Sequence, residues 1–177
     1  PLAPNKRLID YRNLESLRGQ PHIDRILGPL AMVMMLKKSP DAWKVLRKEF
    51  LPNFKHPTIG AYVALGYIHL KKFGKAKNIL VRLASHMDNP VVVKAFMEYY
   101  FQNREVENLI KFGETERILD KDYQFRKVYF HHLAMSGVPE QALRVAQHEE
   151  QHTPGFIVSQ VQIICQSYCL AGKYKRA

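Results

Sequence analysis

Bulky and small apolar residues recur along this chain at a fixed distance and with a nearly fixed period. In five ten-residue strings a bulky residue is followed nine positions later by alanine or leucine: VMMLKKSPDA from Val33, YIHLKKFGKA from Tyr67, YFQNREVENL from Tyr100, LAMSGVPEQA from Leu133 and YCLAGKYKRA from Tyr168. The last residues of these strings are separated by 34, 33, 33 and 35 residues. A period of this size is typical of proteins whose repeating unit is one pair of helices.

The pattern inside each repeat predicts two helices joined by a tight turn. A Lys-Lys, Asn-Arg or Ser-Gly pair marks the end of the first helix, and Pro40 or Pro139 marks the start of the second, because proline is favoured at the first helical position. The small residue that ends each string lets the two helices approach closely. Breaker segments separate the repeats at residues 52–57, 88–90, 120–122 and 153–155. No β-type alternation competes with this pattern, so we predict an all-α fold.

These signals divide the chain into an N-terminal extension, residues 1–20, and a helical-repeat domain, residues 21–177. The repeats are predicted at about 21–55, 56–89, 90–121, 122–155 and 156–177. The last repeat lacks its second helix, so we expect more chain to follow. One helix pair cannot bury its apolar faces alone, whereas stacked pairs share a continuous core. The alternative, an ordinary helical bundle, has no reason to repeat at a constant spacing.

The charge of the chain adds a second signal, because it is large and uneven. Its 27 Lys and Arg against 16 Asp and Glu give a net charge of +11. Residues 1–89 carry 16 basic and 6 acidic side chains, net +10, while residues 90–177 carry 11 and 10, net +1. This distribution favours a polyanionic partner or an acidic membrane surface. No apolar run approaches the roughly 20 residues that cross a bilayer. Cys165 and Cys169 are expected as reduced thiols on one helix face.

The strings YIHLKKFGKA, LAMSGVPEQA and YCLAGKYKRA resemble the turn between the two helices of tetratricopeptide and pentatricopeptide repeats, and the resemblance covers about residues 24–177. It implies a right-handed α–α superhelix, or solenoid, of about five helix-turn-helix repeats. The pentatricopeptide resemblance further implies a scaffold that binds single-stranded RNA and acts on organellar transcript stability, processing or translation. It places the chain in the mitochondrial matrix, and the low acidic content of residues 1–89 agrees with that location.

Two other functions stay open at this point. The tetratricopeptide resemblance implies a protein–protein interaction adaptor that holds a peptide or helix in its concave groove, and Pro154 stands where that family commonly ends its second helix. A subunit of a ribonucleoprotein assembly would use the same basic residues against folded RNA. Base specificity is not predicted, because the positions that read bases in pentatricopeptide repeats are not polar here: Gly28, Tyr62, Ala95, Val128 and Ile163 early in the first helix, and Pro57, Pro90, Tyr123 and Val158 at the repeat end.

Basic residues at the predicted turns form the candidate RNA-binding site. Equivalent turns of a solenoid stack along one edge, so their cations should make a positive ridge that follows a phosphate backbone. The predicted RNA-binding residues are Lys37, Lys38, Lys71, Lys72, Arg104 and Lys173 in the turns, Lys44, Lys48 and Lys75 early in the second helices, and Lys94, Arg126 and Lys127 in the first helices.

One string suggests metal chemistry. Residues 148–152 read HEEQH, a literal H-E-x-x-H, in which two histidines one turn apart bind zinc and the glutamate activates water. However, Thr153 and Pro154 end the helix at once, and no histidine or acidic residue follows that could be a third ligand. We interpret the string as an exposed polar cluster at a helix end. We therefore predict no metal site, no cofactor and no enzymatic activity.

Overall fold

The computed structural model describes residues 23–36 and 56–173, and all of the regular secondary structure in these ranges is helical. The all-α prediction is therefore confirmed for the described residues. The predicted extension, residues 1–20, and the second helix expected within residues 37–55 lie outside them. The chain divides into two compact units, Pro1–Leu83 (unit 1) and Ala84–Ala177 (unit 2), and each is considered separately.

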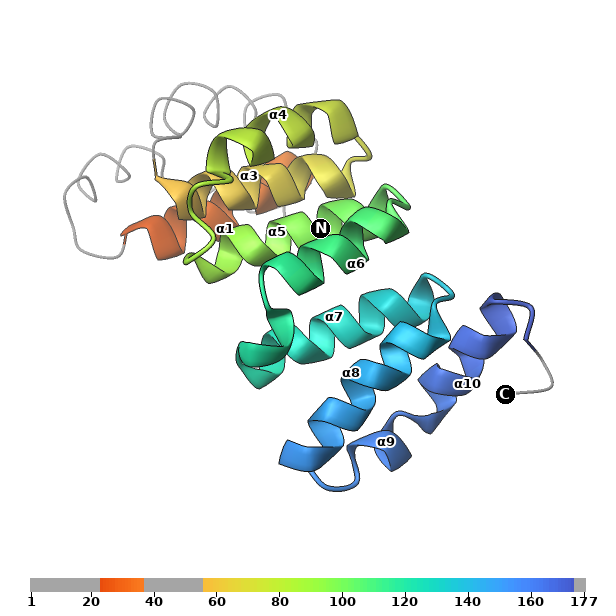
Figure 1. Ribbon diagram of the computed structural model, residues 1–177. Helices are drawn as coiled ribbons and strands as arrows, with labels where there is room; N and C mark the ends of the chain where they lie inside the picture. The colour runs from red at the N-terminus through yellow and green to blue at the C-terminus, as the bar shows by residue number, and fades with distance from the viewer. Residues whose placement is uncertain (1–22, 37–55, 174–177) are drawn as a thin grey trace, which may run out of the picture. The chain divides into compact units, whose positions relative to one another are not determined.

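In unit 1 three helices pack around glycine contacts. Helix α1 (Ile23–Leu36) lies along α3 (Pro57–His69), and α4 (Phe73–Leu83) folds back against α3 (Figure 1). A Cβ atom added at Gly28 would lie 2.3 Å from Cδ2 of Tyr62, and one added at Gly66 would lie 2.8 Å from Sδ of Met35. Both glycines therefore allow α1 and α3 to approach more closely than larger residues would permit.

Unit 2 contains two complete helix pairs and the beginning of a third. Helix α5 (Pro90–Gln102) pairs with α6 (Val106–Thr115), and α7 (Tyr123–Met135) pairs with α8 (Pro139–His152) after a short 3-10 helix, η4 (Ile118–Asp120). Helices α9 (Phe156–Ser159) and α10 (Val161–Leu170) follow, and α10 packs on both α7 and α8 (Figure 1). Large apolar side chains such as Phe130, Leu133 and Leu109 are almost completely buried between these helices.

The helix starts follow the predicted period. First helices begin at residues 57, 90, 123 and 156, and second helices begin at 73, 106 and 139, so each series advances by 33 residues. Asn89 and Asp122 cap α5 and α7 by accepting hydrogen bonds from backbone N–H groups two and three positions on. Pro57, Pro90 and Pro139 occupy the first position of α3, α5 and α8, as prolines commonly do.

The same turn joins the two helices of each pair. One residue in each turn has a left-handed backbone: Lys71 (φ 57°), Arg104 (φ 59°), Gly137 (φ 71°) and Gly172 (φ 71°). The next residue donates its N–H to the carbonyl five positions earlier, from Lys72 to Tyr67 (2.8 Å), Glu105 to Tyr100 (2.8 Å), Val138 to Leu133 (3.3 Å) and Lys173 to Tyr168 (2.9 Å). This is the Schellman ending of a helix. Its acceptors are the bulky residues that begin four of the five repeated strings.

The break between α9 and α10 accounts for the longer last spacing. Helix α9 begins 33 residues after α7, but α10 ends 35 residues after α7 does. The two additional residues are accommodated at Gln160, where the backbone leaves the helical region (φ −109°, ψ 7°) and a new helix starts. The first helix of this pair is therefore interrupted, whereas α5 and α7 are continuous.

Candidate nucleic-acid interface

The α3–α4 pair has a basic surface without acidic residues. Residues 56–83 contain five Lys and Arg and no Asp or Glu. All five are exposed, and we call them the α3–α4 basic surface: Lys71, Lys72, Lys75, Lys77 and Arg82. No carboxylate within the pair competes with a phosphate for these cations, so their attraction to a polyanion is not reduced locally.

Local structure arranges these cations around the turn and along α4. Lys71 is the left-handed residue of the turn, and its Nζ lies 5.9 Å from the ring centre of Phe73. Lys75 follows one turn later, with Nζ 5.8 Å from the ring centre of Tyr67. Arg82 stands two helical turns after Lys75 on the same side of α4, away from the buried Ala76 and Leu80. Cation–π contacts of this length hold an ammonium group near a ring while leaving it exposed.

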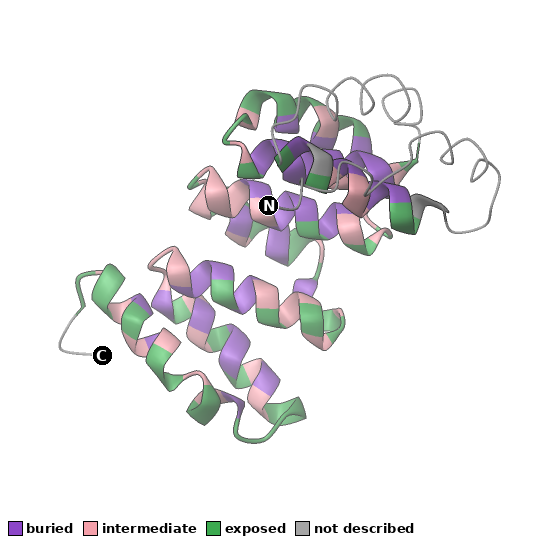
Figure 2. Ribbon diagram, turned by 180° about the vertical axis from the view of Figure 1, so that it is seen from behind, coloured by how far each residue is buried: buried purple, intermediate pink, exposed green. Residues whose placement is uncertain are grey.

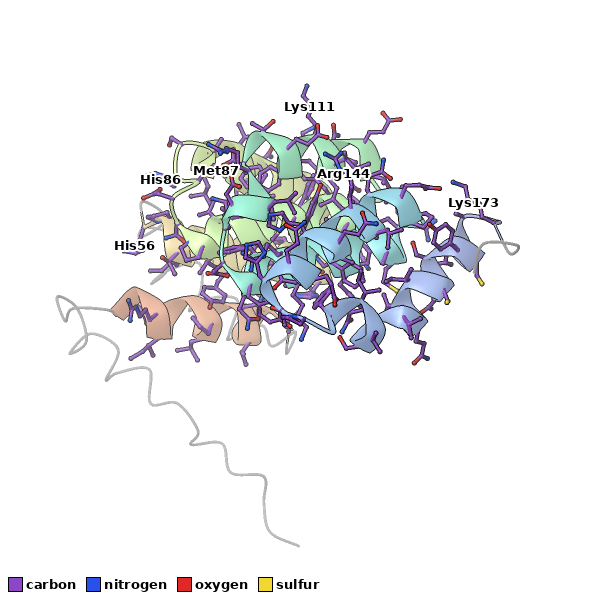
Figure 3. All side chains as sticks on the ribbon, turned by 60° about the horizontal axis from the view of Figure 1, so that its bottom comes forward. His56, His86, Met87, Lys111, Arg144 and Lys173 are labelled. Atoms are coloured by element: carbon purple, nitrogen blue, oxygen red, sulfur yellow. The ribbon has the colours of Figure 1, made fainter. Side chains whose placement is uncertain are left out.

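The α5–α6 pair has a different charge balance. Lys94 and Arg104 are exposed, as is Lys111, which points away from the helices (Figure 3). Residues 89–116 also contain five glutamates against these three cations. Lys127, on α7, is exposed as well, with Nζ 5.6 Å from the ring centre of Tyr123. Cations predicted to bind RNA are thus present in unit 2, but carboxylates surround them and weaken the local field.

Arg126, predicted as an RNA contact, is instead part of a buried ion pair. Its Nε donates to Glu149 Oε2 and its Nη1 donates to the carbonyl of Lys121. Glu149 is 1% exposed and also accepts from Thr153 Oγ1 at 2.8 Å. The hydrogen bond between the two partners lowers the pKa of Glu149 and raises that of Arg126, so both remain charged at neutral pH. Arg126 joins α7 to α8, and we do not include it in the interface.

Lys173 also has a partner within the chain. Its Nζ lies 2.6 Å from Oε1 of Glu140, and both side chains are close to half exposed. This pair connects the turn after α10 to the start of α8, so Lys173 is a weaker candidate for phosphate binding than Lys71 or Lys72. Four other predicted contacts, Lys37, Lys38, Lys44 and Lys48, lie outside the described residues.

The H-E-x-x-H string closes α8. Helix α8 ends at His152, as expected, and the Glu150 carboxylate accepts from the N–H groups of Gly155 and Ile157, both at 2.7 Å. These hydrogen bonds lower the pKa of Glu150. The expectation of an exposed cluster was wrong for Glu149, which is buried against Arg126 and therefore not available to activate water. No group of three or more His, Cys, Asp or Glu in the described part of the chain could hold a metal ion.

Unit 2 also contains a cavity of about 220 Å³ beside α6, α7 and α8. Its lining includes Arg117 and Arg144 but also Glu114 and Asp120, so its charges balance and it has no preference for an anion. Tyr129 closes one side, donating its hydroxyl to the carbonyl of Ile110 at 3.4 Å. Burial raises the pKa of Tyr129 to about 12, which keeps this hydroxyl protonated.

Comparisons with family models, with curated proteins and with solved structures found no match to this chain. Within residues 23–36 and 56–173, no helix is long and apolar enough to span a membrane. The α3–α4 basic surface is therefore the site on which a functional proposal rests. Sequence reasoning identified three of its five members, and the signal that separates it from the other turns, the lack of Asp and Glu in residues 56–83, was already in the sequence.

Proposed function

We propose that this chain is an RNA-binding helical-repeat scaffold whose α3–α4 basic surface holds the phosphate backbone of single-stranded RNA. In this proposal the helix pairs form one right-handed superhelix of the pentatricopeptide kind. The scaffold acts in the mitochondrial matrix on the stability, processing or translation of an organellar transcript. The observation that carries the proposal is the presence of five exposed Lys and Arg on residues 56–83 without a single acidic residue.

The backbone of the turns supports the same conclusion. Gly137 and Gly172 occupy the left-handed position in two turns, but Lys71 and Arg104 occupy it in the other two. A residue with a side chain costs about 1 kcal/mol more than glycine in this conformation. Strain of this kind is tolerated when a side chain has a function at that place. Lys71 therefore contributes a cation to the turn at the expense of stability.

Salt dependence of RNA binding tests the proposal. Binding of an unstructured RNA oligonucleotide is measured by fluorescence anisotropy at several salt concentrations. Each phosphate neutralised in a single strand contributes roughly 0.7 to the slope of log affinity against log salt. The combined variant Lys71→Gln, Lys72→Gln, Lys75→Gln and Arg82→Gln should therefore lower the slope by about 3.

A matched variant controls for total charge. Lys94→Gln, Arg104→Gln, Lys111→Gln and Lys127→Gln together remove the same four charges from unit 2, and the slope should change by less than about 1. The proposal fails if the unmodified chain does not bind RNA at low salt, or if both variants reduce the slope equally. The assignment to RNA fails if single-stranded DNA of the same sequence binds as tightly, because the 2′-hydroxyl is then not recognised.

A further inference from the structure

The outer face of α10 has the composition of an interface. Residues 154–172 contain no charged side chain, although Val158 (76%), Val161 (55%) and Leu170 (55%) are well exposed. Figure 2 shows that exposed and intermediate residues cover most of α9 and α10. Protein surfaces in contact with water usually carry roughly a quarter to a third charged residues. An exposed helix without any charge is therefore expected to meet another apolar surface.

Helix α1 has a similar face. Residues 26–36 contain no charged side chain, and Ile26 (60%), Val33 (42%) and Leu36 (39%) are exposed on it. These three lie on the side of α1 opposite Leu27, Ala31 and Met35, which are buried. Thus the first and the last of the described first helices of the repeats, α1 and α10, each leave one uncharged face exposed.

The contacts between successive first helices show how such faces pair. In unit 1, Met35 of α1 lies against Gly66 of α3, since a Cβ atom added there would be 2.8 Å from Sδ. In unit 2, the ring of Phe101 on α5 stacks on His132 of α7, with centres 4.3 Å apart and planes 4° apart. Met35 and Phe101 are two periods of 33 residues apart, and so are Gly66 and His132. Both interfaces therefore use the same two repeat positions.

We call the position of Met35 and Phe101 the forward position and that of Gly66 and His132 the backward position. In α7 and α10, which pack together, Ala134 is forward and Ser167 is backward, and both are completely buried. The forward position of α10 is Cys169, which is exposed. The backward position of α1 is Val33, also exposed. The two terminal first helices thus leave opposite halves of one interface uncovered.

We propose that this chain associates head to tail, with α10 of one copy packing on α1 of a second copy and Cys169 placed against Val33. The register follows from the three interfaces within the units. Both faces lack charges, so their contact leaves no charge buried without a partner. Because the two halves are different surfaces, the contact is heterologous and adds copies in a line. The inference uses neither Lys71 nor any other member of the basic surface, and it stands independently of RNA binding.

Self-association of the chain without RNA tests the inference. Sedimentation velocity is measured over a concentration series in reducing buffer, which prevents disulfides through Cys165 and Cys169. The unmodified chain should form larger species as concentration rises. Val33→Glu and Cys169→Glu each place a charge in the contact and should weaken association at least about tenfold. Val81→Glu, at a 65% exposed position of α4, is the matched control and should change nothing.

Mixing the two variants tests the polarity of the contact. A Val33→Glu copy keeps its α10 face and a Cys169→Glu copy keeps its α1 face, so the mixture should form dimers and no larger species. Circular dichroism confirms that each variant keeps its helical content, as expected because both positions are exposed. A chain that remains monomeric at high concentration overturns the inference. So does association that only Cys169→Glu weakens, since α10 would then pair with α10.

Discussion

The two units use their cations in different ways. In the α3–α4 pair of unit 1, all five Lys and Arg are exposed and no acidic residue accompanies them. In unit 2, Arg126 forms a buried pair with Glu149, and Lys173 and Arg117 pair with Glu140 and Asp120 at the surface. Both units have the same 33-residue spacing of helix starts and the same turn. The helical framework therefore does not determine whether its charges stabilise the fold or remain available to a ligand.

This difference is informative because clustered like charges oppose folding. Five exposed cations on one helix pair repel one another, and a repeat selected only for stability would intersperse carboxylates among them, as residues 89–116 do. A polyanion bound to the surface relieves the repulsion. We conclude that unit 1 carries its charges for binding, whereas unit 2 uses a large part of its own to join helices.

The largest expected effect concerns the buried pair of unit 2. Glu149→Ala leaves the Arg126 guanidinium buried without its partner and should reduce the free energy of unfolding by about 3–5 kcal/mol. Urea denaturation followed by circular dichroism measures the change. Lys75→Ala, at an exposed position of unit 1, should change stability by less than about 0.5 kcal/mol. If Glu149→Ala costs no more than Lys75→Ala, the contrast between the units is wrong.

The same pair predicts how stability depends on pH. The pKa of Glu149 is lowered in the folded chain, chiefly by its hydrogen bond with Arg126. A carboxylate with a depressed folded pKa contributes its stability above its unfolded pKa, and this contribution is lost as pH falls from about 4.5 through the lower folded value. Below that range Glu149→Gln should therefore differ less from the unmodified chain than it does at neutral pH.

A smaller effect distinguishes a closed helix contact from an open one. A Cβ atom at Gly113 of α6 would lie 2.2 Å from Cζ of Tyr129, so Gly113→Ala should destabilise unit 2 by about 1–3 kcal/mol. Gly74 of α4 has no neighbouring atom within 4 Å of such a Cβ. Gly74→Ala should instead stabilise unit 1 by about 0.5–1 kcal/mol, because alanine favours helix over glycine. Thermal unfolding of the two variants measures both changes.

The repeated features of the fold were predictable because they depend on residues close in sequence. The strings that begin at Tyr67, Tyr100 and Leu133 identify the turn, and the breakers between them locate the helix starts. The Arg126–Glu149 pair was not predictable in this way, since its partners are 23 residues apart and no local pattern joins them. For the same reason, Glu149 was expected on an exposed tail when it is among the most buried residues.

The candidate site was predictable in part. Lysines at the turns are visible in the sequence, but the availability of each cation depends on a partner that only packing reveals. Lys173 illustrates this, because Glu140, its partner, lies 33 residues away at the start of another helix. The left-handed backbone of Lys71 and Arg104 was also missed, since lysine and arginine give no local signal for that conformation. Equivalence with Gly137 and Gly172 in the repeat alignment is the signal that could have found it.

The smallest effect separates the cost of the turn cations from their use. Lys71→Gly and Arg104→Gly relieve the left-handed strain, and each should raise the free energy of unfolding by about 0.5–1 kcal/mol after the greater flexibility of unfolded glycine is included. Lys72→Gly removes the same charge as Lys71→Gly without relieving such strain, so it should lower stability by up to about 1 kcal/mol. Urea denaturation of the three variants measures the differences.

RNA binding by the same variants then distinguishes the two units. Lys71→Gly should weaken binding at low salt and reduce the salt slope by roughly 0.7, the contribution of one phosphate, while the protein becomes more stable. Arg104→Gly should become more stable and keep nearly all of its affinity, because the glutamates of residues 89–116 already offset that cation. Equal losses of affinity at both positions would show that the turn cations act alike in the two units, and the basic surface would then extend beyond α3 and α4.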